Sequence, residues 1–214
     1  MTKFGVRNQS LLMREFLTIH NPPIADVDFV VDDADISASV AGEDVTLTQA
    51  IIPHTGRNLT VAVTDASGTN LTVTATVVGK DHFGKSISET FTANGTPTVA
   101  TGEKIFKDIE SVTIDSIANN TTSDKLNIGF GNKLGLLAQV SAASQIDITR
   151  QLEDGTSGVT GLATVLAGSS TYVDRTYNAL KAVGSGGSGA IATGDQFGIF
   201  IRHNHEDPDD RFRE

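Results

Sequence analysis

Cysteine and tryptophan are both absent from this chain of 214 residues, and basic residues are few. The missing cysteines exclude disulfide bonds, thiolate metal sites and cysteine nucleophiles. The 16 lysines and arginines stand against 26 aspartates and glutamates, which gives a net charge of −10. Nucleic acids and anionic membrane surfaces both attract basic residues. We therefore expect no nucleic-acid partner and no membrane partner.

Long apolar runs are also absent. No stretch approaches the roughly 20 apolar residues that a helix needs to cross a bilayer. Lys3 and Arg7 precede an apolar stretch near the N-terminus, but Arg14 and Glu15 interrupt it. Because this is a poor signal peptide, we expect synthesis in the cytoplasm.

Motifs for catalysis and cofactor binding are missing as well. The glycines of segment 129–135 have the wrong spacing for a phosphate loop, and no Gly-x-Ser-x-Gly occurs. His203–His205 matches the letters of an HNH nuclease but lacks the zinc-finger-like unit and the basic surface. The two histidines and two acids of segment 203–207 are ordinary cation ligands, although a charged tail seldom preorganises a site. We expect no enzyme activity, no cofactor and no metal.

What the chain does contain is a repeated alternation of apolar residues with polar or small ones. Segments 58–65, 71–78, 87–92 and 125–131 alternate in this way, and 195–203 reads as a last strand. A period of two is that of a strand with one buried face, and no strand–helix–strand order appears. The sequence predicts an all-β fold: an antiparallel β-sandwich of Greek-key or immunoglobulin-like topology.

Two segments of this pattern allow more than one interpretation. Ile87 and Phe91 share a face with Glu89, which breaks the alternation. Either this strand lies at the edge of a sheet, or a bulge shifts its parity. Segment 105–114 mixes two periods and suits a turn of helix or a kinked strand.

The N-terminal residues 10–19 predict a short amphipathic helix. A serine caps it, apolar residues follow at helical spacing, and Pro22-Pro23 ends it. It either packs on its own domain or forms an arm that reaches a neighbouring subunit. In the second case the partner-docking residues are Leu12, Phe16 and Ile19.

Acidic residues crowd the span between Arg14 and Arg57, where no lysine or arginine occurs. The acids are Glu15, Asp26, Asp28, Asp32, Asp33, Asp35, Glu43 and Asp44. Segments 27–31 and 44–52 look like strands, so the acids lie within or beside a sheet. They form a solvated face, or they contact a basic partner or a bound cation. Their spacing does not fit the helix–loop–helix calcium pattern.

These signals divide the chain into three parts. Residues 1–30 form an N-terminal arm with the short helix, residues 31–203 form a single β-sandwich domain, and residues 204–214 form a flexible acidic tail. The glycine- and serine-rich run 184–189 has the composition of a flexible loop.

Most of the central region is similar to a known family. GRNLTVAVTD, LTVTATVVGKDHFGKSISETFT, TGEKIFKDIESVTI and LNIGFGNKLGL, within residues 50–137, resemble small virion proteins of tailed bacteriophages. Members of that family are described as head decoration, cement or head-fibre proteins. The ending TYVDRTYNALKAV…DQFGIFI resembles the last strands of the same family more loosely.

The resemblance implies a structural role on the virion. A β-sandwich of this kind binds the major capsid protein on the outside of the shell, often as a homo-oligomer, and stabilises the head. Alternatives are a tail, connector or fibre component, or a carbohydrate-binding attachment module. Sandwiches bind glycans through exposed aromatic residues, and here Tyr172, Tyr177 and a few phenylalanines could serve.

Overall fold

A computed structural model defines the fold of the chain. The described residues are 13–20, 22–53, 56–95, 99–135, 146–152, 158–159, 176–178 and 196–203. Side chains are described within 22–53, 56–95 and 99–135. The regular structure of these residues consists of strands, without a helix.

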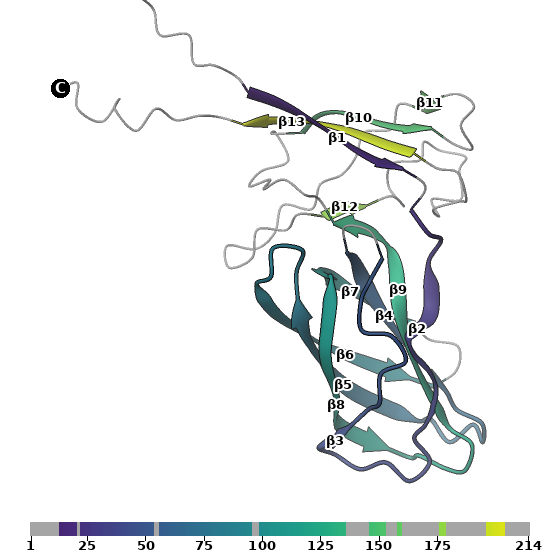
Figure 1. The fold of residues 1–214 in the computed structure, drawn as a ribbon. Coiled ribbons are helices and arrows are strands. Elements are labelled where there is room, and N and C mark those ends of the chain that lie inside the picture. The colour runs from purple at the N-terminus through teal and green to yellow at the C-terminus, as the bar shows by residue number, and fades with distance from the viewer. Residues whose placement is uncertain are drawn as a thin grey trace, which may run out of the picture.

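Strands follow one another along the whole described chain (Figure 1). They are β1 (Met13–His20), β2 (Asp26–Asp35), β3 (Glu43–Asp44), β4 (Arg57–Thr64), β5 (Thr72–Lys80), β6 (Ser86–Asn94), β7 (Val99–Phe106), β8 (Asp108–Ala118), β9 (Lys125–Gly135), β10 (Ile146–Leu152), β11 (Gly158–Val159), β12 (Thr176–Asn178) and β13 (Gln196–His203).

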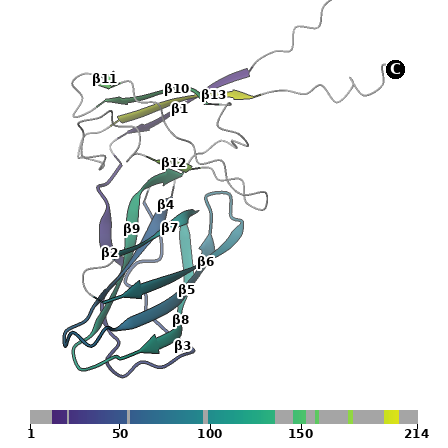
Figure 2. The ribbon, with the colours of Figure 1, turned by 180° about the vertical axis from the view of Figure 1, so that it is seen from behind.

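Two antiparallel sheets form a sandwich. One has the order β3-β8-β5-β6, which Figure 2 shows side by side. In the other, β9 lies between β4 and β2, β7 pairs with the far side of β4, and β12 pairs with the end of β9. The arrangement of β2-β9-β4-β7 against β3-β8-β5-β6 is that of an eight-stranded jelly roll. The prediction of an all-β antiparallel sandwich is confirmed.

The core lies between the two sheets. In β5, Val73, Ala75 and Val77 are fully buried, and the threonines between them are partly exposed. Leu59 of β4 and Ile128 of β9 face them from the other sheet and are also fully buried. Burial of apolar surface stabilises a fold by about 25 cal/mol per Å². The apolar side chains of the alternating strands therefore hold the two sheets together.

The mixed segment 105–114 is a kinked strand rather than a turn of helix. β7 ends at Phe106 and β8 begins at Asp108, so the single residue Lys107 links β7 of one sheet to β8 of the other. The backbone N–H of Lys107 donates to the carbonyl of Lys80 at 2.7 Å, and its own carbonyl accepts from Ile52. The segment mixes two hydrophobic periods because the chain passes from one sheet to the other within it.

The strand expected at 44–52 is wrong for most of its length, because β3 ends at Asp44. The residues that follow run between the two sheets instead of along one. Val45 N donates to Val112 O of β8 at 2.8 Å, and Thr48 N donates to Val30 O of β2 at 2.8 Å. This segment thus closes one side of the sandwich with backbone hydrogen bonds.

The helix expected at residues 10–19 is also wrong. Residues 13–20 form β1, which pairs antiparallel with β13 from Met13↔His203 to His20↔Gln196. Eight paired positions give the segment backbone partners that a local helical pattern does not reveal, and Thr18 and Ile19 are β-branched residues that favour strands. Tertiary pairing overrides a weak helical preference here.

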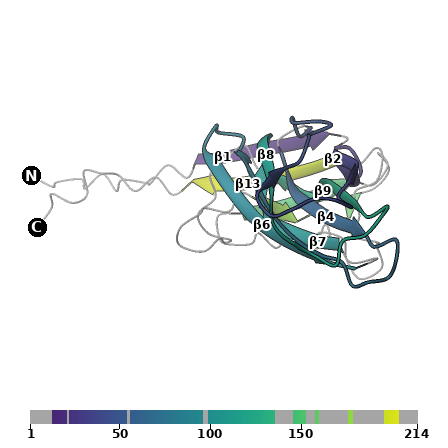
Figure 3. The same cartoon turned by 90° about the horizontal axis from the view of Figure 1, so that it is seen from below.

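A third sheet, β1-β13-β10-β11, brings the two ends of the chain together. Figures 1 and 2 show this sheet beyond the end of the sandwich at which β9 meets β12. β1 and β13 lie side by side in the view from below (Figure 3). β2 contains both residue 30 and residue 31, between which the boundary of the N-terminal arm was expected. The division of the chain into three parts stays a prediction.

Candidate functional site

The position of Glu89 in β6 is settled by the pairing of its strand. β6 is the last strand of its sheet, and it pairs with β5 from Lys80↔Ser86 to Thr72↔Asn94 without a register shift. Of the two interpretations, the edge strand is therefore correct and the bulge is not. Glu89 points toward the inside of the sandwich between the buried Ile87 and Phe91.

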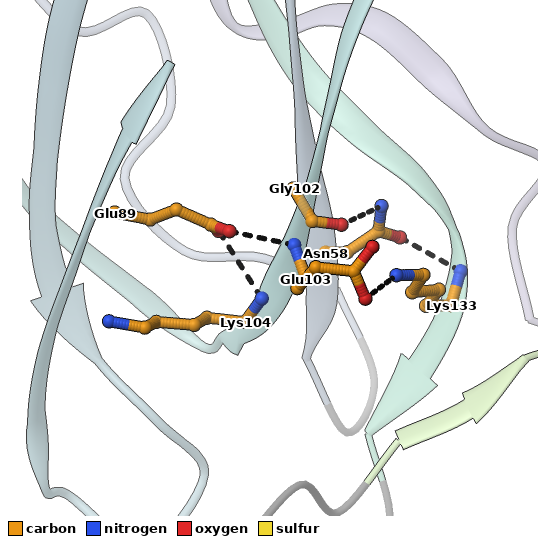
Figure 4. Close-up of polar contacts among 6 residues, drawn as sticks. All are labelled: Asn58, Glu89, Gly102, Glu103, Lys104 and Lys133. Carbon is orange, nitrogen blue, oxygen red and sulfur yellow. Dashed lines mark hydrogen bonds and ion pairs between the residues drawn. The ribbon is translucent and has the colours of Figure 1, made fainter. Parts of the chain in front are cut away.

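The Glu89 carboxylate joins the edges of the two sheets (Figure 4). It accepts hydrogen bonds from the backbone N–H of Glu103, at 2.7 Å, and of Lys104, at 3.2 Å, both on β7. In the opposite direction, Nζ of Lys104 donates to the backbone carbonyl of Ser88 on β6 at 2.5 Å. Side chains thus close the side of the sandwich that backbone hydrogen bonds leave open.

A bulge in β7 makes these contacts feasible. The β4–β7 pairing shifts register between Asn58 and Thr60, which sets residues 102–104 out of the ladder. Asn58, fully buried, holds the bulge from the other side: its Nδ2 donates to the carbonyl of Gly102 at 3.1 Å, and its Oδ1 accepts from the N–H of Lys133 at 2.8 Å. Figure 4 shows Asn58 between Gly102 and Lys133.

Two glycines make room for this network. A Cβ on Gly102 would lie 2.5 Å from Oε2 of Glu89, and a Cβ on Gly131 would lie 2.7 Å from Nδ2 of Asn58. An ion pair between Lys133 and Glu103 completes the network. We name the β6–β7 clasp the set Asn58, Glu89, Gly102, Glu103, Lys104 and Lys133.

The electrostatics of the β6–β7 clasp centre on Glu89. Burial raises the pKa of its carboxyl above the ordinary value, against the lowering effect of the two N–H donors and of the Lys104 ammonium. The negative charge of Glu103 adds to the increase. Glu89 and Asn58 form hydrogen bonds to backbone groups of neighbouring strands, so the arrangement holds these strands together. An inward carboxylate and a bulge also protect sheet edges from pairing with other chains.

Arg57, at the start of β4, is a second buried charge. Its Nε and Nη2 donate to the carbonyl of Gly131 at 2.9 and 2.5 Å, and its Nη1 donates to the carbonyl of Pro23 at 2.9 Å. The guanidinium lies 4.9 Å from the ring centre of Phe130, which packs edge-on against Phe29. Burial lowers the pKa of Arg57 to about 10. Arg57 therefore ties the connection between β1 and β2 to β9.

The outer face of the sheet β3-β8-β5-β6 carries a group of hydroxyls. We name the hydroxyl face the residues Thr72, Thr74, Thr76, Ser88, Thr90, Thr92, Ser111 and Thr113. Thr76 and Thr90 lie opposite each other on β5 and β6, with their Oγ1 atoms 2.8 Å apart. Thr76 donates to Oδ2 of Asp115 at 2.6 Å. Thr113 donates to Oδ1 of Asp44 at 2.7 Å.

Most of the acids that crowd the sequence before Arg57 lie on or near β2. Asp28, Asp32, Asp33 and Asp35 are exposed on that strand. A side-chain hydrogen bond with Asp26 raises the pKa of Asp28, and burial and like charge add to this increase.

Among the residues whose side chains are described, no three histidines or acids come together to hold a metal ion. In the same part of the chain, no helix has the length and apolarity to cross a membrane.

Two of the three docking residues predicted at the N-terminus, Phe16 and Ile19, lie on a strand and not on a helix. Leu12 lies outside the described residues. Phe16 pairs with Phe200, and Ile19 pairs with Phe197, in the β1–β13 ladder. The acidic tail 204–214 also lies outside the described residues. The proposal that these residues dock a partner stays a prediction.

Sequence reasoning singled out Glu89 but missed Arg57 and Asn58. Both stand at the start of an alternating strand, where a polar residue attracts no attention. Their partners Gly102 and Gly131 are distant in the sequence, and the only signal is a glycine within each partner strand.

Comparison with protein-family models, with curated proteins and with solved structures found no match.

Proposed function

We propose that this chain is a structural virion protein of a tailed phage that binds the outside of the capsid shell as a decoration or cement protein. Its partner is the major capsid protein, and it acts as a homo-oligomer through its surfaces rather than as an enzyme. The finer topology fits this role, since viral capsid domains are among the proteins built as jelly rolls. That likeness is an analogy of fold and supports the proposal only in combination with the residues.

One observation carries the proposal: the way in which the described polar side chains are used. Three of them, the buried Arg57 and Asn58 and the partly buried Glu89, hydrogen-bond to backbone groups and hold strands in place. Others, on β5 and β6, form an open sheet face with hydroxyl groups. A rigid sandwich with a broad polar face is suited to binding another protein surface. The resemblance of segments within residues 50–137 to phage decoration proteins supports a capsid shell as that surface.

The test is the addition of purified protein to undecorated shells of the major capsid protein from the virus that encodes this chain. We expect the shells to bind hundreds of copies and to resist heating better than untreated shells, because binding stabilises the bound form by mass action. Shells that bind none of the protein and gain no stability would overturn the proposal.

The alternatives predict other results in the same experiment. A tail or connector component appears in purified virions at about a dozen copies or fewer, which quantitative mass spectrometry would measure. An attachment module binds sugars on a glycan array and leaves undecorated shells bare. Jelly rolls also occur in lectin domains, so the array is a necessary comparison.

A further inference from the structure

The two sheets of the sandwich differ in how their outer faces are covered. On β4, the outward-facing Asn58 and Thr60 are 0% and 7% exposed. The backbone of β2 at Asp26 and Val27 lies against Gly129 of β9 so closely that a Cβ there would collide with it. Other parts of the chain therefore cover the outer face of this sheet around Thr60 and Gly129.

The outer face of the other sheet is open. On its edge strand β6, Ser88, Thr90 and Thr92 are exposed, and on the central strand β5 Thr74 and Thr76 are partly exposed. These are the residues of the hydroxyl face, in register across the two strands. Of the two broad faces of the sandwich, this one is accessible to a partner.

The hydrogen bonds within the hydroxyl face determine which of its hydroxyls can still donate a proton to a partner. Because Thr76 donates its only hydroxyl proton to Asp115, the short contact between Thr76 and Thr90 must use the proton of Thr90. Thr113 likewise donates to Asp44. The hydroxyl oxygens of Thr90 and Thr113 therefore keep lone pairs but no proton for a partner. At these two positions the face offers acceptors.

Two acidic side chains next to the hydroxyl face add negative charge to it. Asp44 and Asp115 contact its threonines directly and are both exposed. Glu110 on β8 pairs with Lys80 on β5 at 2.6 Å, which neutralises that corner. Lys104 lies at the β6 edge, where its ammonium donates to the carbonyl of Ser88. Among the residues whose side chains are described, Asp44 and Asp115 have no ion-pair partner.

We infer that the hydroxyl face, with Asp44 and Asp115, is the surface that docks on the partner protein, and that the facing partner surface carries lysine and arginine side chains. Those side chains are donors without acceptors, so they match a face that offers acceptors and negative charge. Opposite charges across an interface speed association and set its orientation. The inference rests on the proposed function for the identity of the partner.

The experiment compares two double variants that remove the same charge from the full-length chain. Asp44→Asn with Asp115→Asn neutralises the face and keeps an oxygen that accepts the threonine protons. Asp28→Asn with Asp32→Asn removes two exposed acids from β2 and serves as the control. Binding of each variant is measured to undecorated shells and to immobilised poly-L-lysine, at low and at moderate salt. Circular dichroism checks that both variants fold.

We expect the face variant to bind shells about tenfold more weakly than wild type, and to lose much of the salt dependence. The loss of charge-assisted contacts accounts for that factor. The control variant is expected to bind within about twofold of wild type. Equal effects of the two variants, or a larger effect of the control, would overturn the inference.

The poly-L-lysine measurement separates this inference from the proposed function. In one outcome, wild type does not bind the shells, and of the two variants only the face variant loses binding to poly-L-lysine. The proposed function then fails, and the basic partner is another protein. If wild type binds the shells and both variants bind as well as it does, the proposed function stands and the docking face is elsewhere. If both variants lose poly-L-lysine binding equally, only net charge matters and the inference fails.

Discussion

At the scale of single residues, the sandwich holds three polar side chains at points where its strands are irregular. Glu89, Arg57 and Asn58 each replace a missing backbone partner: Glu89 at the β7 bulge, Arg57 at Gly131 and Pro23, and Asn58 at Gly102. A buried backbone group without a partner is costly. The polar side chains therefore belong to the architecture and compensate for the irregular points of the strands.

The raised pKa of Glu89 predicts how stability changes with pH. Because the folded chain holds this proton more tightly than the unfolded chain, its contribution is fully present below the ordinary pKa of 4.5. The contribution is lost as the pH rises through the higher folded value. Glu89→Gln does not titrate, so the difference in unfolding free energy should move in favour of the variant as the pH rises above 4.5.

Urea unfolding of wild type and Glu89→Gln at a series of pH values measures this difference. Glu43→Gln removes the same charge from an exposed residue of β3 and is the control. A Glu89 difference that stays constant with pH would contradict the assignment of a raised pKa.

Arg57 predicts a contrast between two substitutions. Lysine keeps the buried charge but cannot form the planar fork that holds Gly131 and Pro23, so Arg57→Lys should cost about 3 kcal/mol. Arg57→Met removes the charge and keeps the packing against Phe130, so it should cost only about 1–2 kcal/mol for the lost hydrogen bonds. Urea denaturation gives both values, and a lysine variant more stable than the methionine variant would refute this account.

At the scale of elements, the bulge of β7 depends on a close fit between Asn58 and Gly131. A methyl group on Gly131 would lie 2.7 Å from the Asn58 amide, so Gly131→Ala must displace it and break its hydrogen bonds to Gly102 and Lys133. We expect a loss of about 2–3 kcal/mol in unfolding free energy.

A double-mutant cycle separates this mechanism from general crowding. In the background Asn58→Ala the amide is gone, so adding Gly131→Ala should cost less than about 1 kcal/mol. The measurement is chemical denaturation of the two single variants, the double variant and wild type. Additive effects would show that Gly131 is required for a reason other than Asn58.

The elements that could be predicted from the sequence are those whose signal is local. β5 and β6 alternate apolar and polar residues within a few positions, so their existence and their buried faces were predictable. β1 was not, because residues 13–20 owe their strand conformation to β13, which is distant in the sequence. The partners of Asn58 are distant in the same way. Long-range pairing is thus what the sequence alone does not reveal.

The candidate site shows the same limit. Glu89 attracted notice because it interrupts a period-two pattern, yet its partners in β7 appear only when the two sheet edges come together. A polar outer face could be predicted from the alternation of segments 71–78 and 87–92. Its acceptor character could not, because it depends on the contacts of Asp44 and Asp115 with two other strands.

At the scale of the whole molecule, the eight strands from β2 to β9 hold a complete core. The buried hydrophobic residues of the sandwich run from Val30 to Leu134 and come from both of its sheets. Among the strands that the structure describes, β1, β13, β10 and β11 form no ladder with them, and β12 pairs with the end of β9. A core of this kind buries most of the apolar surface of a domain of about 100 residues.

We therefore predict that a fragment of residues 22–135 folds by itself. It keeps Pro23, so Arg57 retains both carbonyl partners, and it keeps every residue of the β6–β7 clasp. The fragment should show a strand-type circular dichroism spectrum and a single cooperative urea transition. A fragment of residues 31–135, which lacks the first half of β2 and the Pro23 contact, should unfold at lower urea. If 22–135 is unfolded while the full chain is stable, the third sheet must hold the sandwich together, and the core between Val30 and Leu134 is insufficient.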